Sequence, residues 1–414
     1  DHLEELGGDG AVSWEKVKLG EISFCIQPGP FGSQLHNSDY ADEGTPIIMP
    51  KDMVDGHIRH TGLIRVPEEH VARLQRHQVC AGNLMVARKG DVRKCVYITE
   101  NENGWLTGSD CLKVALNENV CFPKYIYYQL RSPYIGRWLE QISIGATMPS
   151  INTGLLSGIE MYLPSLEIQR RIADILSAYD DLIENNRKQI KLLEEAAQRL
   201  YKEWFVDLRF PGHEHTKIMD GVPEGWERAH LSDIADINAN NIPKNYCFNY
   251  IEYTDLSAVQ NGIIREKTRY ALNEAPGRAK RMANDGDIIW GMVRPNLKSF
   301  ALVLHPTETD VFSTGFCVLS AKKVPFTYLY YAVTTESFIK YLVNCTNGAA
   351  YPAVKPIHFS EAEIILPHEK ILKRFNIVVE PMLRKREKLL LIINQASQAR
   401  DRLLPKLMSG EVEV

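Results

Sequence analysis

The chain contains the same sequence pattern twice. Near its start it reads WEKVKLGEI (14–22), and much further along it reads WERAHLSDI (226–234). A second pair of similar strings consists of GATMPSI (145–151) and GAAYPAV (348–354). After each of these strings a Leu-Pro step and then two basic residues recur in the same order. The sequence therefore predicts two similar halves, and such a chain can imitate a symmetric dimer that binds a two-part target.

Length and composition indicate a globular protein with more than one domain. The 414 residues, 44% of them hydrophobic, are enough for two or three domains with full cores. Apolar runs such as LLLII (389–393) are far shorter than the roughly 18 residues that span a bilayer, and the first residues do not resemble a signal peptide. The eight cysteines are irregularly spaced and lack a zinc-type pair. We therefore expect a cytoplasmic protein with reduced thiols.

Positive charge gathers in two segments, although the net charge is −4. Residues 72–94 contain six Lys or Arg against one acid, and residues 263–298 contain eight against four. Each segment alone is explained as well by a solvated surface. Their similar places in the two halves favour a shared binding role.

Each half follows one plan: a mixed segment with short β-branched runs and turns, and then a long helical stretch. The segments 122–142 and 325–344 are expected to be helix pairs whose aromatic residues belong to the core. We predict a mixed α+β fold in which two similar globular domains are separated by two long antiparallel helices in a coiled-coil-like pair, a pseudo-two-fold internal repeat. The predicted boundaries are 1–164 (first domain), 165–209 (central helix), 210–366 (linker and second domain) and 367–414 (distal helix).

The two long stretches have matching lengths and apolar stripes. From Ser165 to Trp204 there is no Pro or Gly, and apolar residues recur every three or four positions. The second stretch, 369–407, has a similar stripe, but we expect Pro381 to kink it or to begin a new helix. A helix of about 40 residues is roughly 60 Å long, so the stripes are expected to cover each other. Asn186 lies on the first stripe, where it either sets the register or faces water.

Motifs of catalysis are missing. The chain has no GxxxxGK[ST] phosphate loop, no GxGxxG after a strand, no HExxH, no GxSxG and no Asn-Pro-Pro-Tyr-like tetrapeptide. His213 and His215 lie in a polar linker without further metal ligands and are expected to be exposed. A duplicated scaffold without such motifs favours a binding or organising protein. The alternatives are a duplicated protein–protein adaptor, and a stand-alone nuclease or methyltransferase with unfamiliar motifs.

Several strings resemble one family, the specificity subunit of type I restriction–modification systems, and together they cover essentially the whole chain. Residues 163–205 resemble its central conserved region, and 367–375 with 403–414 resemble its distal one. Residues 13–22 and 222–234 resemble the starts of its two target-recognition domains. Further strings that resemble these domains are GPFGSQLHNSDY (29–40), GTPIIMPKDMVDGHI (44–58), GNLMVARKGDV (82–92) and GDIIWGMVRPNLKSF (286–300).

The resemblance implies a non-catalytic, DNA-binding subunit that holds no cofactor itself. Each recognition domain would read one half of a bipartite target with an unspecified gap. Methyltransferase subunits, two per chain, would bring S-adenosylmethionine and methylate adenine N6. A motor-nuclease subunit would bring ATP and Mg²⁺, unless the system only methylates. A rigid helix pair would fix half-sites about one DNA turn apart, near 34–36 Å, and changing it by a helical turn should change the gap.

The residues expected to contact DNA are cations and amides in the two basic regions, because Lys and Arg bind phosphates while Arg, Lys, Asn and Gln also bind bases. The GATMPSI and GAAYPAV segments are expected to be structural turns. In the first half the expected residues are Ser33, Gln34, Lys51, Arg59, Arg88, Lys89, Arg93 and Lys94. In the second half they are Arg265, Lys267, Arg294, Asn296 and Lys298.

Overall fold

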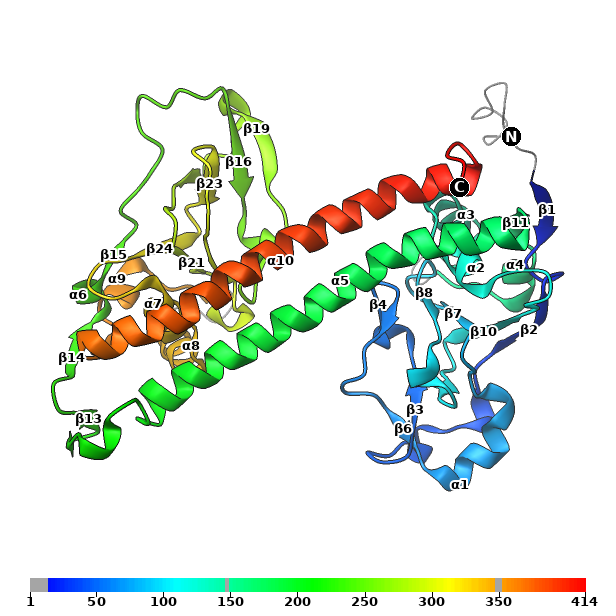
Figure 1. Ribbon diagram of the computed structural model, residues 1–414, viewed down its shortest axis with the longest axis horizontal. Helices are drawn as coiled ribbons and strands as arrows, with labels where there is room; N and C mark the ends of the chain where they lie inside the picture. Colours follow the sequence, from blue (N-terminus) through cyan, green and yellow to red (C-terminus); the bar gives the residue numbers. More distant parts are fainter. Residues whose placement is uncertain (1–13, 146–148, 347–351) are drawn as a thin grey trace. The chain divides into compact units, whose positions relative to one another are not determined.

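The computed structural model describes residues 14–145, 149–346 and 352–414 (Figure 1). The chain folds into two compact units, of which the first is built from two pieces of the sequence and the second from one. The first unit comprises Asp1–Glu184 with Ile393–Val414, and the second comprises Asn185–Ile392. Each unit therefore contains one mixed segment together with parts of both long helices.

The first unit is built on a four-stranded antiparallel sheet in the order β2-β10-β7-β8. Its strands are β2 (Ser23–Pro28), β10 (Cys111–Leu116), β7 (Leu84–Ala87) and β8 (Cys95–Tyr97). A smaller sheet has the order β6-β3-β9, in which β3 and β9 are parallel. Its strands are β6 (Arg65–Val66), β3 (Thr45–Ile48) and β9 (Leu106–Thr107). A short hairpin is formed by β4 (Met53–Val54) and β5 (His57–Ile58).

The second unit repeats this topology. Its antiparallel sheet has the order β15-β24-β21-β22, with β15 (Ala235–Ile237), β24 (Phe316–Ala321), β21 (Ile288–Gly291) and β22 (Phe300–Leu302). The other sheet has the order β19-β16-β23-β20, and its central pair is again parallel. Its strands are β19 (Thr268–Ala271), β16 (Tyr250–Thr254), β23 (Asp310–Ser313) and β20 (Ala279–Arg281). Short hairpins are formed by β17 (Val259–Gln260) with β18 (Ile263–Ile264), and by β12 (Ile218–Met219) with β13 (Val222–Pro223).

In each unit the first repeated string pairs with the strand that ends at the Leu of the repeated Leu-Pro step. In the first unit β1 (Glu15–Lys18) pairs with β11 (Glu160–Leu163), with Glu15 opposite Leu163. In the second, β14 (Glu227–His230) pairs with β25 (Glu363–Leu366), with Glu227 opposite Leu366. The same antiparallel ladder thus closes the frame of both units, which confirms the predicted internal repeat.

Three short helices of each unit also correspond: α2 (Pro123–Leu130) to α7 (Phe326–Thr334), α3 (Pro133–Ile142) to α8 (Glu336–Asn344), and α4 (Thr153–Ser157) to α9 (Pro356–Ser360). The other two short helices do not correspond, because α1 (Glu68–Val71) follows β6 whereas α6 (Leu231–Ile234) follows β14. Tyr125 and Tyr128 of α2 and Tyr328 of α7 are fully buried, which confirms that these aromatics belong to the core.

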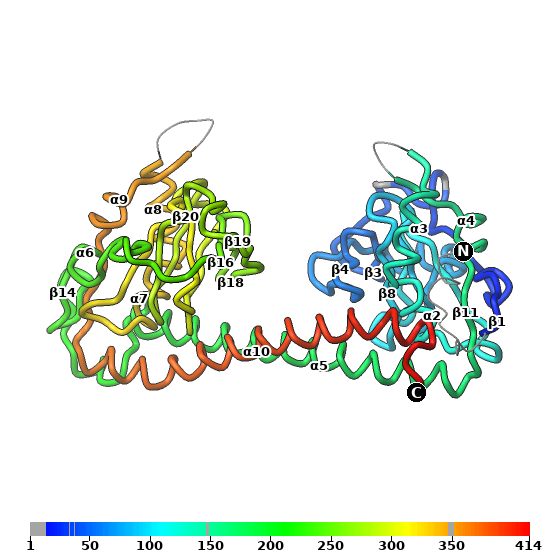
Figure 2. The backbone as a smooth tube through the Cα atoms, turned by 90° about the horizontal axis from the view of Figure 1, so that it is seen from above, coloured from blue at the N-terminus to red at the C-terminus, as the bar shows by residue number. Residues whose placement is uncertain are grey.

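The two long helices are α5 (Leu166–Tyr201) and α10 (Glu369–Ser409), and they are antiparallel. In the first unit Ile172 and Leu176 of α5 share a hydrophobic core with Leu404 and Leu407 at the end of α10. In the second unit Ala197 and Tyr201 of α5 share a core with residues near the start of α10, including Phe375. Both views show the helices running side by side (Figure 1; Figure 2). The predicted pairing of the two apolar stripes is confirmed.

The structure decides between alternatives for two residues of these helices. Pro381 does not begin a new helix, because α10 is continuous from Glu369 to Ser409. Proline cannot donate a backbone hydrogen bond, but the free energy lost in this way is outweighed by burial, since Val379 and Leu383 on either side pack into the core of the second unit. Asn186 is only 4% exposed, which excludes the alternative that it faces water. Its side-chain nitrogen has no hydrogen-bond partner among the described residues.

Candidate nucleic-acid interface

The connection between β7 and β8 carries four of the predicted DNA contacts, Arg88, Lys89, Arg93 and Lys94. The backbone N–H of Arg88 donates to the carbonyl of Asp110 at 2.7 Å, and its carbonyl accepts from Ile151 at 2.9 Å. The N–H of Gly90 donates to the carbonyl of Pro149 at 3.0 Å. The basic connection is therefore fixed by backbone hydrogen bonds to the segment that follows residues 146–148.

Two further predicted residues join this connection through the 3₁₀ turn η3 (Pro50–Asp52). The ammonium of Lys94 donates to the carbonyl of Pro50 at 3.0 Å, beside Lys51. The N–H of Arg59 donates to the carbonyl of Asp52 at 2.8 Å, and its guanidinium contacts the buried Asp52 carboxylate at 3.4 Å. These contacts gather six predicted residues into what we call the first basic cluster: Lys51, Arg59, Arg88, Lys89, Arg93 and Lys94.

Several cations of the first basic cluster already have carboxylate partners. Lys89 lies 3.0 Å from Asp110, and Arg93 lies 3.1 Å from Asp91 and 3.3 Å from Glu140. The hydrogen bond to Asp91 is the main reason why the pKa of Arg93 is raised. In the part of the chain that the structure describes, the side chains of Lys51 and Arg88 have neither an ion pair nor a hydrogen bond. These two cations are therefore the most available for phosphate.

The glycine-rich turn before the 3₁₀ turn η1 (Gly32–Gln34) packs close to the same region. A Cβ on Gly29 would lie 2.0 Å from the carbonyl oxygen of Gly108, so only glycine permits this approach. The carbonyl of Gln34 accepts a hydrogen bond from Arg73, which was not among the predicted residues. The backbone of Ser33 lies in η1, and its side chain lies outside the described part of the structure. Sequence reasoning missed Phe31, which is 56% exposed at this turn.

The second unit uses the same arrangement in the connection between β21 and β22. The N–H of Arg294 donates to the carbonyl of Pro352 at 2.8 Å, and the N–H of Val354 donates to the carbonyl of Met292 at 2.9 Å. The central residues of GATMPSI and GAAYPAV, 146–148 and 348–351, lie outside the described residues. Their C-terminal flanks, however, are bonded to the basic connection in both units. Sequence reasoning treated these segments as turns only, although their duplication was a signal of this association.

The remaining predicted residues of the second half lie at two places. The N–H of Asn261, at the tip of the β17–β18 hairpin, donates to the carbonyl of Lys298 at 2.9 Å, which brings the hairpin to the β21–β22 connection. Arg265 follows this hairpin and donates to Gln260 at 2.6 Å. The ammonium of Lys298 pairs with Glu336. Lys267 lies 2.6 Å from the buried carboxylate of Asp310, as in a structural ion pair. We call Arg265, Arg294, Asn296 and Lys298 the second basic cluster.

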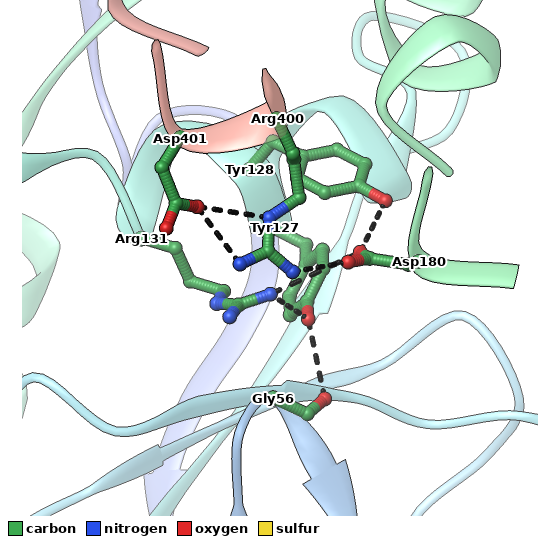
Figure 3. A network of polar contacts seen from close by, with 7 residues as sticks. All are labelled: Gly56, Tyr127, Tyr128, Arg131, Asp180, Arg400 and Asp401. Atoms are coloured by element: carbon green, nitrogen blue, oxygen red, sulfur yellow. Dashed lines mark hydrogen bonds and ion pairs between the residues drawn. The ribbon is translucent and has the colours of Figure 1, made fainter. Parts of the chain in front are cut away.

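A charged network ties the helix pair of the first unit to the β4–β5 hairpin (Figure 3). The buried carboxylate of Asp180 on α5 accepts hydrogen bonds from Arg400 on α10 and, at 2.7 Å, from Tyr128 on α2. Arg131 lies 4.0 Å from Asp180 and donates to the hydroxyl of Tyr127 at 2.5 Å. That hydroxyl donates to the carbonyl of Gly56 at 3.2 Å. Burial, reinforced by Asp180, raises the pKa of Tyr128, so its hydroxyl remains a donor.

In the second unit a residue of the helix pair bonds directly to the equivalent hairpin, β17–β18. Arg386 of α10 is buried and donates to Glu194 of α5 at 2.5 Å and to the carbonyl of Gly262 at 2.8 Å. Asp55-Gly56 and Asn261-Gly262 both have positive φ angles, as in the tight hairpin turns that favour Asn-Gly and Asp-Gly. Sequence reasoning missed these helix residues. The available signal was the charge of Asp180 and Arg386 within otherwise apolar stripes.

No group of three His, Cys, Asp or Glu residues in the described ranges could hold a metal ion. The eight cysteines are free thiols, and burial raises the pKa of Cys95 to about 12. No helix of the described residues is long and apolar enough to cross a membrane.

Comparison with known proteins decides the family. The model of the type I restriction modification DNA specificity domain matches residues 11–195 and again residues 223–382. The chain belongs to this family. It is the DNA specificity subunit of a type I restriction–modification system, and this subunit is non-catalytic within its complex. The membership decides against the adaptor and the stand-alone enzyme.

Several known relatives match over nearly their whole length. The specificity subunit of the type I restriction enzyme MjaIX from Methanocaldococcus jannaschii is 25% identical over 419 residues, which cover 97% of this chain and 94% of the relative. The specificity subunit of the HindI enzyme from Haemophilus influenzae is 20% identical, with 96% and 99% covered. The crystal structure of a type I S subunit from M. genitalium has a TM-score of 0.64 at 14% identity and 97% coverage of both chains, and so shares the fold.

Proposed function

We propose that each unit of this specificity subunit reads one half of a bipartite DNA target through its basic cluster. The observation that carries the proposal is the repeated backbone bonding of the β7–β8 and β21–β22 connections to the segments ending at Ile151 and Val354. It supports one interface per unit, built at the same position of the repeat. Domain boundaries at 1–164, 165–209, 210–366 and 367–414 are part of this proposal.

Within the first basic cluster, Lys51 and Arg88 are proposed as phosphate contacts, because they lack internal partners among the described residues. Lys89, Arg93, Lys94 and Arg59 lie around them and reinforce the positive potential, while Ser33 and Gln34 stay candidates at the glycine-rich turn. In the second unit Arg265, Arg294 and Lys298 are proposed for phosphates and Asn296 for a base. Lys267 is the weakest candidate, because its ammonium is held by Asp310.

The partners are proposed from the repeat of the helix pair. Each unit presents its own stretch of α5 and α10, and exposed apolar side chains on these helices include Leu182, Leu192, Ile377 and Leu391. Because each unit has its own stretch of the helix pair, we propose two methyltransferase subunits per chain, which would supply S-adenosylmethionine and methylate adenine N6. A motor-nuclease subunit with ATP and Mg²⁺ completes a restriction system, and a methylation-only assembly needs none.

The experiment is a salt titration of DNA binding by the chain assembled with its methyltransferase partner. The double variant Lys51→Ala/Arg88→Ala should weaken binding to a duplex that contains the DNA motif which the assembled complex methylates, called the methylated motif below. The slope of log K against log salt should fall by about two, since each phosphate contact contributes about one. Fluorescence anisotropy at several salt concentrations measures both quantities.

The matched control is Lys16→Ala. Lys16 is an exposed cation of the same unit on β1, where it pairs with Glu160 at 2.7 Å. Its removal should leave the salt slope unchanged. An equal slope for the double variant and the wild type would show that the first basic cluster does not contact DNA.

A further inference from the structure

The tip of the β21–β22 connection in the second unit has an unusual backbone. It consists of the 3₁₀ turn η10 (Pro295–Leu297), with Arg294 before it and Lys298 after it. Both flanking residues adopt the left-handed conformation, with φ angles of 48° and 56°. Residues other than glycine are strained there, and such strain persists only where the surroundings impose it, often at binding sites.

The surroundings of η10 do impose this backbone. The N–H of Arg294 donates to Pro352 at 2.8 Å, and the carbonyl of Lys298 accepts from Asn261 at 2.9 Å. Within the turn, Leu297 donates to the carbonyl of Arg294 at 2.9 Å, and Lys298 donates to that of Pro295 at 3.0 Å. The side chain of Lys298 is also held by its ion pair with Glu336. A turn fixed at both ends presents its two tip residues, Asn296 and Leu297, in one orientation.

These two tip residues have no structural role that explains their exposure. Leu297 is 49% exposed, although it is an apolar residue between cations. Asn296 is exposed, and its side chain has no hydrogen-bond partner in the described part of the chain. The apolar residue in the corresponding connection of the first unit is Val92, which is buried in the core of that unit. The second unit thus exposes an amide and an apolar side chain in a connection where the first unit exposes neither.

An adjacent amide and apolar side chain match one base pair in the major groove. Asn binds adenine through its N6 and N7 atoms, and apolar side chains contact the thymine methyl group. We infer that Asn296 and Leu297 read an A·T pair in the half-site bound by the second unit. This inference rests on the proposed function and adds to it the identity of one base pair and the residues that recognise it.

The test removes the thymine methyl group from the DNA and the Leu297 side chain from the protein, separately and together. The wild-type chain, assembled with its methyltransferase partner, is titrated with duplexes of the methylated motif in which each thymine of the half-sites in turn is replaced by deoxyuridine. Loss of the methyl group at one position should weaken binding about four-fold. Leu297→Ala should weaken binding by a similar factor and should be insensitive to the same replacement.

A second variant tests the amide. Asn296→Ala should lose most of the discrimination between A·T and G·C at that position, which we expect to be about ten-fold or more in the wild type. Leu272→Ala, which removes another exposed apolar side chain of the second unit, should behave as the wild type does.

The inference is overturned if Leu297→Ala retains full affinity and still responds to every deoxyuridine as the wild type does. It is also overturned if Asn296→Ala keeps the full preference for A·T. If the wild-type complex shows no preference for the motif, the proposed function is overturned and this inference with it, whereas failure of the tip variants alone overturns only this inference.

Discussion

At the scale of single residues, the buried guanidinium of Arg386 makes the clearest prediction. Its side chain is 5% exposed and depends on Glu194, which is 35% exposed, and on the carbonyl of Gly262. Glu194→Ala leaves this cation without its carboxylate, which should lower the free energy of unfolding by about 1–3 kcal/mol. Urea denaturation followed by circular dichroism measures the loss. The matched control is Glu195→Ala, whose exposed pair with Lys191 should contribute less than about 0.5 kcal/mol. Equal losses in both variants would contradict the buried pair.

Sequence could predict the cations of the proposed interface but not their intramolecular partners. Arg88 and Arg294 follow from charge clusters at repeated positions. The pairing of Lys267 with Asp310 and of Arg400 with Asp180 joins residues that are distant in sequence, and only the folded chain brings them together. The exposed Leu297 was missed for a related reason, because an apolar residue in a basic segment carries no local sign that it lies outside the core.

At the scale of elements, the tight β17–β18 hairpin is one place where the helix pair of the second unit contacts the mixed segment, through Arg386. A Cβ on Gly262 would lie 2.7 Å from the hydroxyl of Tyr330 and 3.2 Å from the guanidinium of Arg386. Gly262→Ala therefore adds a clash to the strain of its positive φ. Gly221→Ala has the strain alone, because Gly221 has a similar φ of 76° and nothing within 4 Å. The control should lose about 1–2 kcal/mol of stability, and Gly262→Ala about 1–3 kcal/mol more. Urea denaturation of both variants is the measurement, and indistinguishable losses would show that the hairpin moves freely away from Arg386.

The long helices show what the spacing of apolar residues can predict and what it cannot. The apolar stripes of α5 and α10 predicted both helices and their antiparallel pairing, because burying such a stripe requires a partner of the same length. The effect of Pro381 could not be predicted in the same way. A local rule gives the cost of a proline in a helix, whereas the compensation comes from tertiary packing of residues such as Phe375 and Leu383.

At the scale of the whole molecule, both long helices continue across the boundary between the units. The boundary lies between Glu184 and Asn185 in α5 and between Ile392 and Ile393 in α10. If the helix pair sets the gap of the target, inserting seven residues at both points adds about two turns and keeps the buried faces in register. The helices lengthen by about 10 Å, which corresponds to about three base pairs at 3.4 Å each. We therefore expect a gap about three base pairs longer with both half-sites unchanged.

The gap is measured by mapping methylated adenines genome-wide in cells that express the variant with its methyltransferase. The control inserts seven residues at Gly221, in the turn between β12 and β13, where nothing lies within 4 Å of an added Cβ. Since this turn lies outside both helices, the control should methylate the original motif with its original gap. A helix variant that methylates the original motif would show that the gap is not set by the length of α5 and α10. A change in the half-sites would show instead that the insertion disturbs the basic clusters, because base recognition is proposed to reside there and not in the helices.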